Sequence, residues 1–476
     1  MKLKINLDKT QAMIISKGYT SYKNRLPLHF DQKSLAYVAF YKYLGVEFQQ
    51  NGKFKQIIKN RMLKAQNAIY MLKRACASAQ ATSIEMYKKL YESKIFPILT
   101  YGSAIWGSPV DNTIYIKSEI SIDKNALSKV SNLEPKCIRI HKNQLSASLK
   151  CKNFKEKLKI IQDKNIRQTY EIQPLMYDVS KSKVEQFVSK CCKRMLGIKK
   201  CCNSTVARLH LGWPPISIKI WISAIKYWLR SLEPNENEIL KSAFLHSKNH
   251  DSLWKDGIQN ILTITGSADI WNNHRFNSKN DFKFQAKIIE QKLIDIYFQN
   301  CQTELDNSKK HGEFTQLHTI ERTKPQYLDM INDPRHRTTI TKLRTHSHCL
   351  QTETGNYTKG ERDYKCPNCE SGAIETVTHF LWECPCSKFK GIRSLILQIL
   401  PTKTKDHSKL TKIILNLDFQ SDDQVIQKVY SLVHKMYKIR EKAFKKPIPQ
   451  NKPPIFTLFI TTFFLAFFQN FYLFTE

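Results

Sequence analysis

Four residues in the C-terminal third of the chain have the types and spacing of a metal site. Cys366 and Cys369 form a Cys-x-x-Cys pair, nine residues separate Cys369 from His379, and four separate His379 from Cys384. Zinc takes four nitrogen or sulfur ligands in a tetrahedron, and a Cys-x-x-Cys turn supplies two of them. We therefore predict a zinc-knuckle module with a structural Zn²⁺ ion. The alternatives to a metal site are a chance Cys-x-x-Cys pair and a redox pair, and neither gives His379 a role. Cys386 remains an alternative to Cys384 as the fourth ligand.

Three bulky apolar residues, Phe380, Leu381 and Trp382, follow the predicted ligand His379. In one interpretation they cover the metal and stack on nucleic-acid bases. In the other they form only a small core. The sequence leaves both interpretations open.

The other cysteines favour buried, reduced thiols. Cys191-Cys192 and Cys201-Cys202 lie on a predicted helix and past its end, and we interpret them as small buried side chains, not as a second metal site. The chain has 13 cysteines, an odd number, and its first residues lack the apolar core of a signal peptide. These features predict a nuclear or cytoplasmic protein.

The charge balance indicates a polyanionic partner. The chain has 76 Lys and Arg residues against 41 Asp and Glu, a formal net charge of +35. Nucleic acid is the commonest polyanion that such a surface binds, so we expect RNA or DNA as the partner. A basic protein of another class, or a coding bias towards Lys, is the alternative. The content of 41% hydrophobic and 25% charged residues is typical of a folded chain, not of a disordered one.

Residues 52–74 predict a long amphipathic helix with a phosphate-binding face. Apolar residues recur every three to four positions, as in a helix with one buried stripe; they are Phe54, Ile58, Met62, Ala65, Ile69 and Leu72. Residues 48–84 contain no Asp or Glu, whereas an ordinary solvated helix face mixes both charges. We therefore expect phosphate contacts from Lys53, Lys55, Lys59, Arg61, Lys64, Lys73 and Arg74.

A second basic stretch, rich in histidine, precedes the Cys/His cluster. It contains Arg335, His336, Arg337, Lys342, Arg344, His346 and His348. Phosphate binding and an ordinary solvated helix face are equally open interpretations of this pattern. Under the first interpretation, the expected phosphate contacts are Arg335, Arg337, Lys342 and Arg344.

The remaining pattern predicts a mainly α chain with a small α+β piece at its N-terminus. Leu3–Leu7 and Met13–Ile15 have the patterning of strands, and a strand pair is expected around Gly45, which permits a tight turn. Helices are expected at 83–95, where Pro97 ends or kinks the helix, and at 153–168, 184–196, 216–232, 410–417 and 425–444. Residues 110–180 are polar and rich in Lys, which indicates an insertion or a linker.

Several stretches, in this order, resemble the reverse transcriptases of non-LTR (LINE-type) retrotransposons. Residues 3–10, followed by Met13, are similar to the palm segment after the catalytic hairpin, and residues 40–46 are similar to the primer-grip turn. Residues 52–74, with 90–91 and 97–106, are similar to the thumb. Further along, residues 187–197 and 211–214 resemble the helical region beyond the thumb. Residues 340–344 and 353–355, with the Cys/His cluster, resemble the family's C-terminal arrangement.

The resemblance covers residues 1–106 and 184–446, and it implies a domain organisation. Palm and primer-grip strands are expected at 1–50, a helical thumb at 51–109, a polar insertion or linker at 110–183 and a helical connector at 184–330. The basic stretch, the zinc-knuckle module and the closing helices follow at 331–446, and a Pro-rich linker with an apolar tail at 447–476. The insertion and the tail depart from the family pattern. Asn356 also departs from it, because the family more often has Arg there.

The resemblance implies nucleic-acid binding without catalysis. The family holds two divalent metals with a Tyr-x-Asp-Asp hairpin that precedes its Asn-x-x-Lys-Thr stretch, and only two residues precede Leu3 here. We therefore expect this chain to be a truncated, inactive remnant, whose catalytic palm would come from a longer reading frame. Lys9 resembles the palm lysine that aids pyrophosphate departure, and it joins the expected nucleic-acid contacts. Asp422-Asp423 is interpreted as the charged start of a helix.

The C-terminal segment 455–474 is uncharged and contains nine Phe or Tyr residues. Its 20 residues are enough for a single transmembrane helix. A second functional hypothesis is therefore a non-enzymatic protein tethered to a membrane. The competing interpretation is translated sequence beyond the end of the domain, separated from it by Pro447, Pro449, Pro453 and Pro454.

Overall fold

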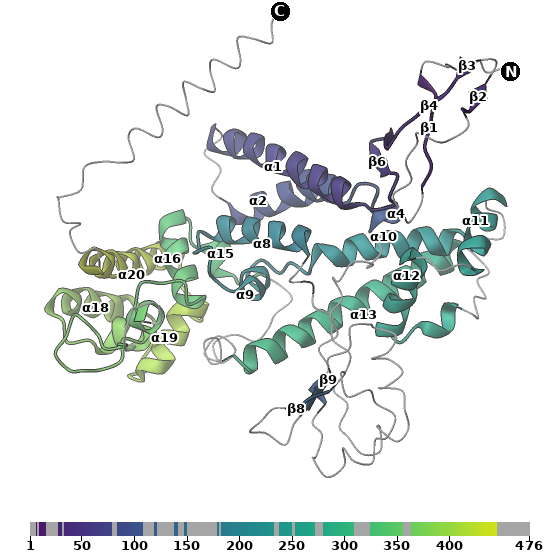
Figure 1. Cartoon of the computed structure of the whole chain (residues 1–476). Coiled ribbons are helices and arrows are strands. Elements are labelled where there is room, and N and C mark those ends of the chain that lie inside the picture. The colour runs from purple at the N-terminus through teal and green to yellow at the C-terminus, as the bar shows by residue number, and fades with distance from the viewer. Residues whose placement is uncertain are drawn as a thin grey trace, which may run out of the picture. The chain divides into compact units, whose positions relative to one another are not determined.

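The described chain is built mainly from helices, with short strands near its N-terminus, as predicted (Figure 1). This computed structural model describes residues 6, 9–15, 27–30, 33–78, 83–107, 119–120, 138–140, 147–149, 179, 182–232, 238–249, 253–271, 279–308, 324–355 and 363–444. The chain divides into two compact units. Unit 1 comprises Met1–Ser347 and Lys412–Asp423, and unit 2 comprises His348–Thr411 and Gln424–Glu476. The segment 331–446, expected to be one region, is thus shared between the two units.

The first described strands form two small sheets. β1 (Gln11–Ala12) pairs in parallel with β4 (Ala36–Tyr37), and β2 (His29–Phe30) pairs antiparallel with β3 (Lys33–Ser34). The strand predicted at Met13–Ile15 is wrong, because β1 ends at Ala12 and its partner β4 is only two residues long, so no described strand pairs with Met13–Ile15. The strand predicted at Leu3–Leu7 lies, apart from Asn6, outside the described residues.

The strand pair predicted around Gly45 is confirmed. β5 (Phe40–Tyr43) and β6 (Val46–Gln49) form an antiparallel hairpin. Both turn residues have positive φ, +45° at Leu44 and +78° at Gly45, which matches the right-handed twist of the flanking strands. Gly45 adopts this backbone without cost, whereas Leu44 is strained there.

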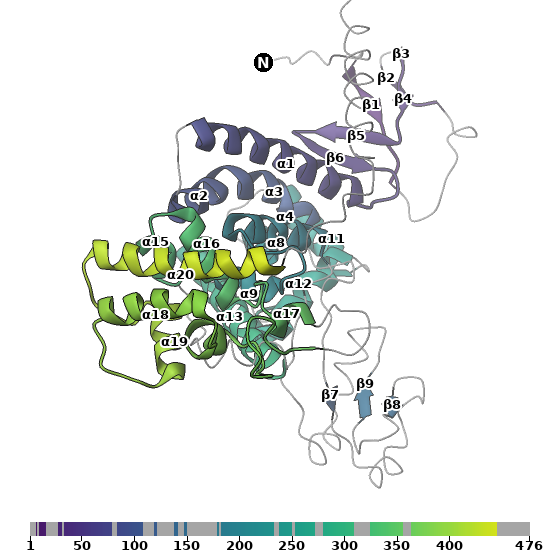
Figure 2. The same cartoon turned by 90° about the vertical axis from the view of Figure 1, so that its left-hand side faces the viewer.

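A long helix and a broken one follow the hairpin. α1 (Lys55–Ser78) packs against the broken helix, as Figure 2 shows from a second side. The broken helix runs through α2 (Ile84–Leu90), the π-helical turn η3 (Tyr91–Ile95) and α3 (Phe96–Thr100), and the short α4 (Ser103–Trp106) comes next. Pro97 lacks the N–H that a regular helix needs. The predicted interruption is a widened π turn that ends at Ile95, two residues before Pro97, and the helix continues beyond it.

The core of unit 1 forms around α10 (Ile216–Arg230). This helix packs against α4, α12 (Leu253–Ile264) and α13 (Lys279–Asp306). Its Trp228 stacks on Trp271 of the short helix η5 (Ala268–Trp271), with ring centroids 5.3 Å apart. Unit 1 also contains α8 (Lys183–Leu196), α9 (Ser204–Leu209), α11 (Glu238–Asn249), α15 (Tyr327–Met330) and α16 (Pro334–Arg344). α8 and α10 confirm two of the predicted helices.

Unit 2 contains the Cys/His cluster and the closing helices. Its elements are α17 (Gln351–Thr354), the π-helical turn η7 (His379–Glu383), α18 (Ser387–Ile399) and parts of α19 (His407–Asn416) and α20 (Asp423–Phe444). α19 and α20 confirm the two predicted C-terminal helices. α20 begins at Asp423, as expected for the Asp422-Asp423 pair.

The predicted apolar tail and one predicted helix also fall on residues that the structure does not describe. The apolar segment 455–474 lies outside the described residues, so the membrane hypothesis stays a prediction. Within the described ranges, no helix combines the length and the apolar character needed to cross a bilayer.

In the predicted insertion 110–183, strands β7 (Glu119–Ile120), β8 (Ile138–Ile140) and β9 (Ala147–Leu149) form a small antiparallel sheet in the order β7-β9-β8. The helix predicted at 153–168 lies outside the described residues.

Candidate metal centre and basic helix face

A small hairpin presents the Cys-x-x-Cys pair. The amide of Cys366 donates to the carbonyl of Ala373 over 2.8 Å, and the amide of Glu375 donates to the carbonyl of Tyr364 over the same distance. Gly372, with a φ of +66°, lets the chain turn back. Both thiols therefore project from one tight loop whose ends are fixed by backbone hydrogen bonds.

The other two cluster residues lie at the two ends of one π turn. The amide of Cys384 donates to the carbonyl of His379 over 2.8 Å, which is the i to i+5 bond of a π-helix. In a regular α-helix, a five-residue step turns the chain by roughly 500°, which leaves two side chains about 140° apart. The wider turn η7 brings His379 and Cys384 to the same side.

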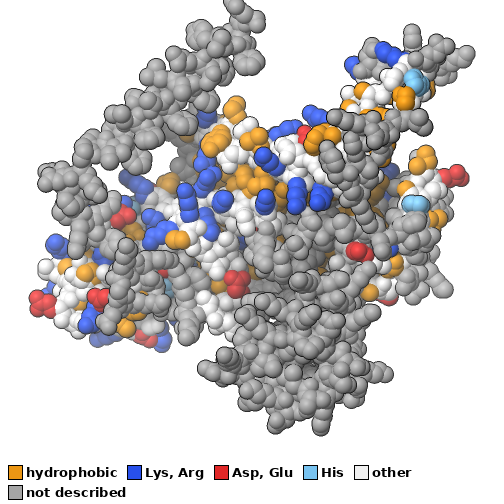
Figure 3. All heavy atoms as spheres, in the orientation of Figure 1, with side chains coloured by type: hydrophobic (Ala, Val, Ile, Leu, Met, Phe, Trp, Pro, Cys, Tyr) orange, Lys and Arg blue, Asp and Glu red, His pale blue; other side chains and the backbone are white. Residues whose placement is uncertain are grey.

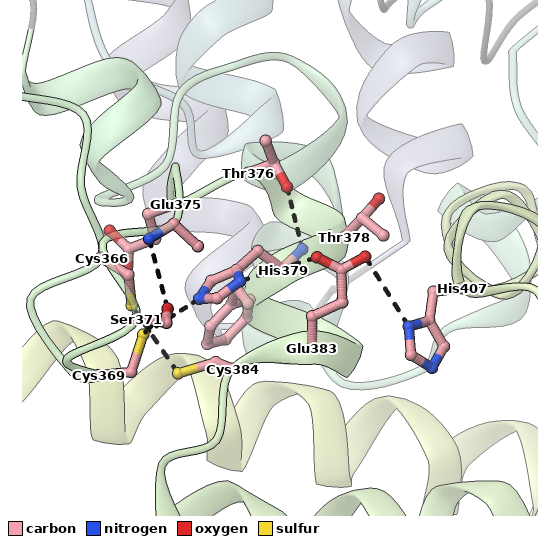
Figure 4. A network of polar contacts seen from close by, with 12 residues as sticks. Cys366, Cys369, Ser371, Glu375, Thr376, Thr378, His379, Glu383, Cys384 and His407 are labelled. Carbon is pink, nitrogen blue, oxygen red and sulfur yellow. Dashed lines mark hydrogen bonds and ion pairs between the residues drawn. The ribbon is translucent and has the colours of Figure 1, made fainter.

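The four side chains converge on one point (Figure 4). Their ligand atoms all lie within 4.8 Å of one another. The Sγ atoms of Cys366 and Cys384 are 3.8 Å apart, and Cys369 Sγ is 3.5 Å from His379 Nε2. A tetrahedral zinc ion with bonds of about 2.3 Å to sulfur and 2.0 Å to nitrogen separates two sulfurs by about 3.8 Å, and a sulfur from a nitrogen by about 3.5 Å. These residues form a Cys₃His group that can hold a metal ion, and its spacing fits zinc.

Burial keeps two thiols of the cluster protonated unless a cation is bound. Burial raises the pKa of the Cys366 thiol to about 12, and burial likewise raises the pKa of Cys384. Burial opposes ionisation of Cys369 as well, but hydrogen bonds from Ser371, whose hydroxyl lies 3.1 Å from the sulfur, and from the other two cysteines together outweigh burial and lower the pKa of Cys369. Thiolates are the metal-binding form of cysteine. A divalent ion supplies the positive charge that keeps buried thiolates ionised.

Two charged side chains lie next to the cluster, Glu383 of the π turn η7 and Arg393 of α18. The Glu383 carboxylate lies 3.7 Å from His379 Nδ1, the ring nitrogen that faces away from the thiols, and 3.8 Å from His407 Nδ1. The guanidinium of Arg393 donates to the carbonyls of Phe380, over 3.0 Å, and of Cys384. Arg393 thereby satisfies carbonyls that the end of η7 leaves without helical partners.

A buried ion pair connects α20 to the Cys-x-x-Cys hairpin. Arg440 Nη2 donates to Glu375 Oε2 over 2.8 Å, and each side chain of the pair is 1% exposed. The same carboxylate accepts from the amide of Gln351 over 2.7 Å. Breaking such a buried pair leaves an uncompensated charge, so this contact fixes the base of the hairpin. It was not predicted from the sequence.

The three apolar residues after His379 form part of a small core. The alternative prediction, that they stack on nucleic-acid bases, is wrong. Phe380, Leu381 and Trp382 are buried, and Phe380 contacts the ring of Phe389 on α18. Trp382 Nε1 donates to the hydroxyl of Thr411 over 3.1 Å. Side chains enclosed in this way have no face open to a base.

The remaining paired cysteines follow the prediction in part. Cys191, Cys192 and Cys202 are buried as expected, whereas Cys201 is exposed. Burial raises the pKa of Cys191 to about 11 and of Cys192 to about 12, as for inert thiols. In the part of the chain that is described, Cys366, Cys369, His379 and Cys384 are the one group of this kind able to hold a metal ion.

Most of the basic residues predicted to bind phosphate at 53–74 are exposed, on α1 or, for Lys53, just before it. The exposed ones are Lys53, Lys55, Lys59, Lys64, Lys73 and Arg74, and Lys9 of the N-terminal segment is exposed as well. Leu63, Tyr70 and Met71 are exposed among them. Lys and Arg side chains gather over this part of unit 1, with few acidic ones between them (Figure 3). The α1 face, defined by these exposed residues of 53–74, thus combines cations with apolar surface.

Arg61 is a correction to the predicted phosphate contacts. Its side chain is buried, and its Nη2 donates to the carbonyl of Gly45 in the β5–β6 turn over 2.6 Å. Its guanidinium lies 4.3 Å from the ring centroid of Tyr101, whose hydroxyl donates to the carbonyl of Leu44 over 2.6 Å. Arg61 and Tyr101 therefore hold the strained turn and are not available to phosphate.

The basic stretch of α16 is mostly internal, so Arg337 and Arg344 are also wrong as phosphate contacts. Arg337 donates to the carbonyl of Ile331 over 3.0 Å, and both arginines are buried. Arg344 donates to Asn416 Oδ1 over 2.7 Å and to His210 Nε2 over 3.3 Å. Lys342 is half-buried, and the exposed Arg335 is bound to Asp333 over 2.7 Å.

Comparison with protein-family models, with curated proteins and with solved structures finds no match to this chain. The resemblance to non-LTR reverse transcriptases therefore stays a prediction from the sequence.

Proposed function

We propose that this chain binds RNA or DNA through the α1 face, in the manner of the thumb of a non-LTR retrotransposon reverse transcriptase. We further infer that the metal ion of the Cys₃His group is a structural zinc. The proposal concerns binding alone and assigns no catalytic step to the described residues.

The observation that carries the proposal is the composition of the α1 face. Six cations are exposed between Lys53 and Arg74, and this stretch contains no acidic residue. Like charges on one exposed surface repel each other, and a phosphate backbone relieves that repulsion by replacing released counterions. Tyr70 and Leu63 are exposed between the cations, so they can contact sugars and bases while the cations contact phosphates.

The inferred zinc has a structural role in this proposal. Four protein ligands close the coordination shell, as in structural zinc sites, whereas a catalytic zinc keeps a position open. The ligands come from two separate segments, the 364–375 hairpin and η7. A bound ion therefore ties these segments into one module, and its binding free energy contributes to the folding of unit 2.

Salt dependence tests the proposal directly. The full chain is titrated with a fluorescein-labelled RNA–DNA hybrid of about 20 base pairs, and anisotropy is measured between about 50 and 200 mM salt. If the six exposed cations all contact phosphate, a plot of log K against log salt has a slope of roughly −5. Binding that does not change over this range, or no binding at all, would overturn the proposal.

A further inference from the structure

The outer face of α8 is also basic, although no phosphate contact was predicted there. The exposed side chains of this helix are Lys183, Gln186, Lys190 and Arg194. They recur at intervals of three or four residues, so they lie on one face of the helix. We refer to these four residues as the α8 stripe.

The single acidic residue of α8 does not balance the stripe. Glu185 is fully buried, and its carboxylate accepts from Arg208 over 2.5 Å and from the amide of Ser217 over 2.7 Å. Within the described residues, Lys183, Lys190 and Arg194 form no ion pair. The carboxylate that would offset the stripe is instead used to join α8 to α9 and to the first turn of α10.

Another long helix of unit 1 shows what an ordinary solvated face looks like. α13 exposes Lys283 and Lys287, but acidic residues flank them along the helix, Asp281 on one side and Glu290 and Asp295 on the other. Such mixing is typical of a surface that only meets solvent. The α8 stripe lacks it, as does the α1 face.

The α8 stripe and the α1 face belong to one region of unit 1. α1 and α8 are in contact, and both views show α8 running beside the α1–α3 layer (Figures 1 and 2). Burial raises the pKa of Cys191 on α8, and the charges of Arg194 on α8 and of Lys73 on α1 both act against that rise. Lys73, near the C-terminal end of α1, and Arg194, near the C-terminal end of α8, therefore both lie near Cys191. The two basic faces are thus close to each other at these ends.

We propose that the α8 stripe is a second phosphate-binding surface, and that one nucleic-acid molecule lies across α1 and α8. This inference rests on the proposed nucleic-acid binding by α1 and extends it. Continuity with the α1 face, with its exposed Tyr70 and Leu63, favours a nucleic acid over an acidic protein or an anionic membrane. The stripe consists of long flexible cations and one amide, side chains that position a backbone without reading a sequence.

The test compares two pairs of lysines on the full chain. K183Q/K190Q removes two cations of the α8 stripe, and K283Q/K287Q removes two exposed cations of α13 as a matched control. Binding of the same labelled RNA–DNA hybrid is measured against salt. We expect the slope of log K against log salt to become shallower by about two in K183Q/K190Q and to stay unchanged in the control. Adding R194Q makes it shallower by about one more.

The outcomes separate this inference from the proposed function. If the unmodified chain binds without salt dependence, the proposed function fails and this inference fails with it. If substitutions on α1 weaken binding but K183Q/K190Q behaves like K283Q/K287Q, only the inference about α8 is overturned. It is also overturned if K183Q/K190Q leaves hybrid binding intact and weakens binding to phosphatidylserine vesicles. Circular dichroism of each variant checks that it retains the helical fold.

Discussion

Cys384 and His379 are joined by a backbone hydrogen bond of 2.8 Å across one π turn. The bond explains why the spacing of four intervening residues places a thiol and an imidazole on one side. The sulfur of Cys384 lies 3.8 Å from that of Cys366. Cys384, and not Cys386, is therefore the fourth residue of the cluster.

Replacing Cys384 removes the metal, whereas replacing Cys386 does not. Cys384→Ser takes away one of four converging ligands, and zinc binding depends steeply on ligand number. We expect about one zinc per chain in the unmodified protein and in Cys386→Ser, and well below half a zinc in Cys384→Ser. Elemental analysis of the purified full chain measures this. Equal loss in both variants would contradict the assignment of the fourth ligand.

We expect Glu383 to tune the affinity of the Cys₃His group for a metal without being a ligand. Its carboxylate is 3.7 Å from Nδ1 of His379, the nitrogen opposite the metal-facing Nε2. Such outer partners orient the imidazole and typically change metal affinity by about 10- to 100-fold. We expect Glu383→Gln to lower zinc affinity within that range, as measured by competition with a chelator.

Glu370→Gln is the matched control for this change, because it removes an exposed carboxylate of the Cys-x-x-Cys loop that does not contact His379. Both variants should give the same absorption spectrum with Co²⁺, because the four ligands are unchanged. An affinity of Glu383→Gln equal to that of Glu370→Gln would refute the positioning role.

Two glycine substitutions have opposite effects on stability. Gly45 has a φ of +78° in the β5–β6 turn, and a Cβ there meets only ordinary contacts, so the backbone conformation alone sets the cost. We expect Gly45→Ala to lower the free energy of unfolding by about 1–2 kcal/mol. Gly391 lies inside α18, where an added Cβ meets nothing within 4 Å. Gly391→Ala should raise the free energy of unfolding by roughly 0.5–1 kcal/mol. Urea unfolding measures both, and an unchanged Gly45→Ala would contradict the left-handed turn.

His210 makes stability depend on pH. Burial, together with the charge of Arg344, lowers the pKa of His210 from 6.5 to about 3. Below about pH 6.5 the unfolded chain therefore binds a proton that the folded chain does not, and stability falls as the pH falls. This residue should account for a loss of about 2 kcal/mol between pH 7 and pH 5.

His210→Gln keeps a donor and an acceptor but does not titrate, so it should lose less stability over the same range. The comparison is made by urea unfolding at each pH. Release of metal on acidification affects both proteins alike and cancels in the difference. Identical pH profiles for the two proteins would show that folding does not lower the pKa of His210.

The parts of the fold that the sequence predicted depend on local patterns. The Cys-x-x-Cys turn and the following His and Cys lie within 19 residues, from Cys366 to Cys384, so spacing alone identifies them. The helix of residues 52–74 follows from apolar periodicity. Its burial was less well predicted, because the buried line runs through Ile57, Arg61, Ala65 and Ile69. The buried Arg61 is stabilised there by two partners distant in the sequence. The carbonyl of Gly45 accepts its hydrogen bond, and the ring of Tyr101 lies against its guanidinium.

The parts that were missed depend on partners far apart in the chain. Arg344 reads as a surface cation in the sequence, yet it is enclosed by Asn416 and His210. Glu375 and Arg440 are 65 residues apart, and neither has a neighbour in the sequence that predicts a buried pair. The α8 stripe, by contrast, was open to prediction from the spacing of Lys183, Lys190 and Arg194. The sequence does not show, however, that Glu185 is buried and so leaves these cations without an acidic neighbour on α8.

The central claim, nucleic-acid binding through the α1 face, is tested most directly by removing charges from that face. K55Q/K59Q/K73Q neutralises three exposed cations of α1, and K226Q/K283Q/K287Q neutralises three exposed cations of α10 and α13. Binding of the labelled hybrid is compared as a function of salt. The slope of log K against log salt should become shallower by about three in the α1 variant and stay unchanged in the control. Equal slopes in the two variants would contradict the account.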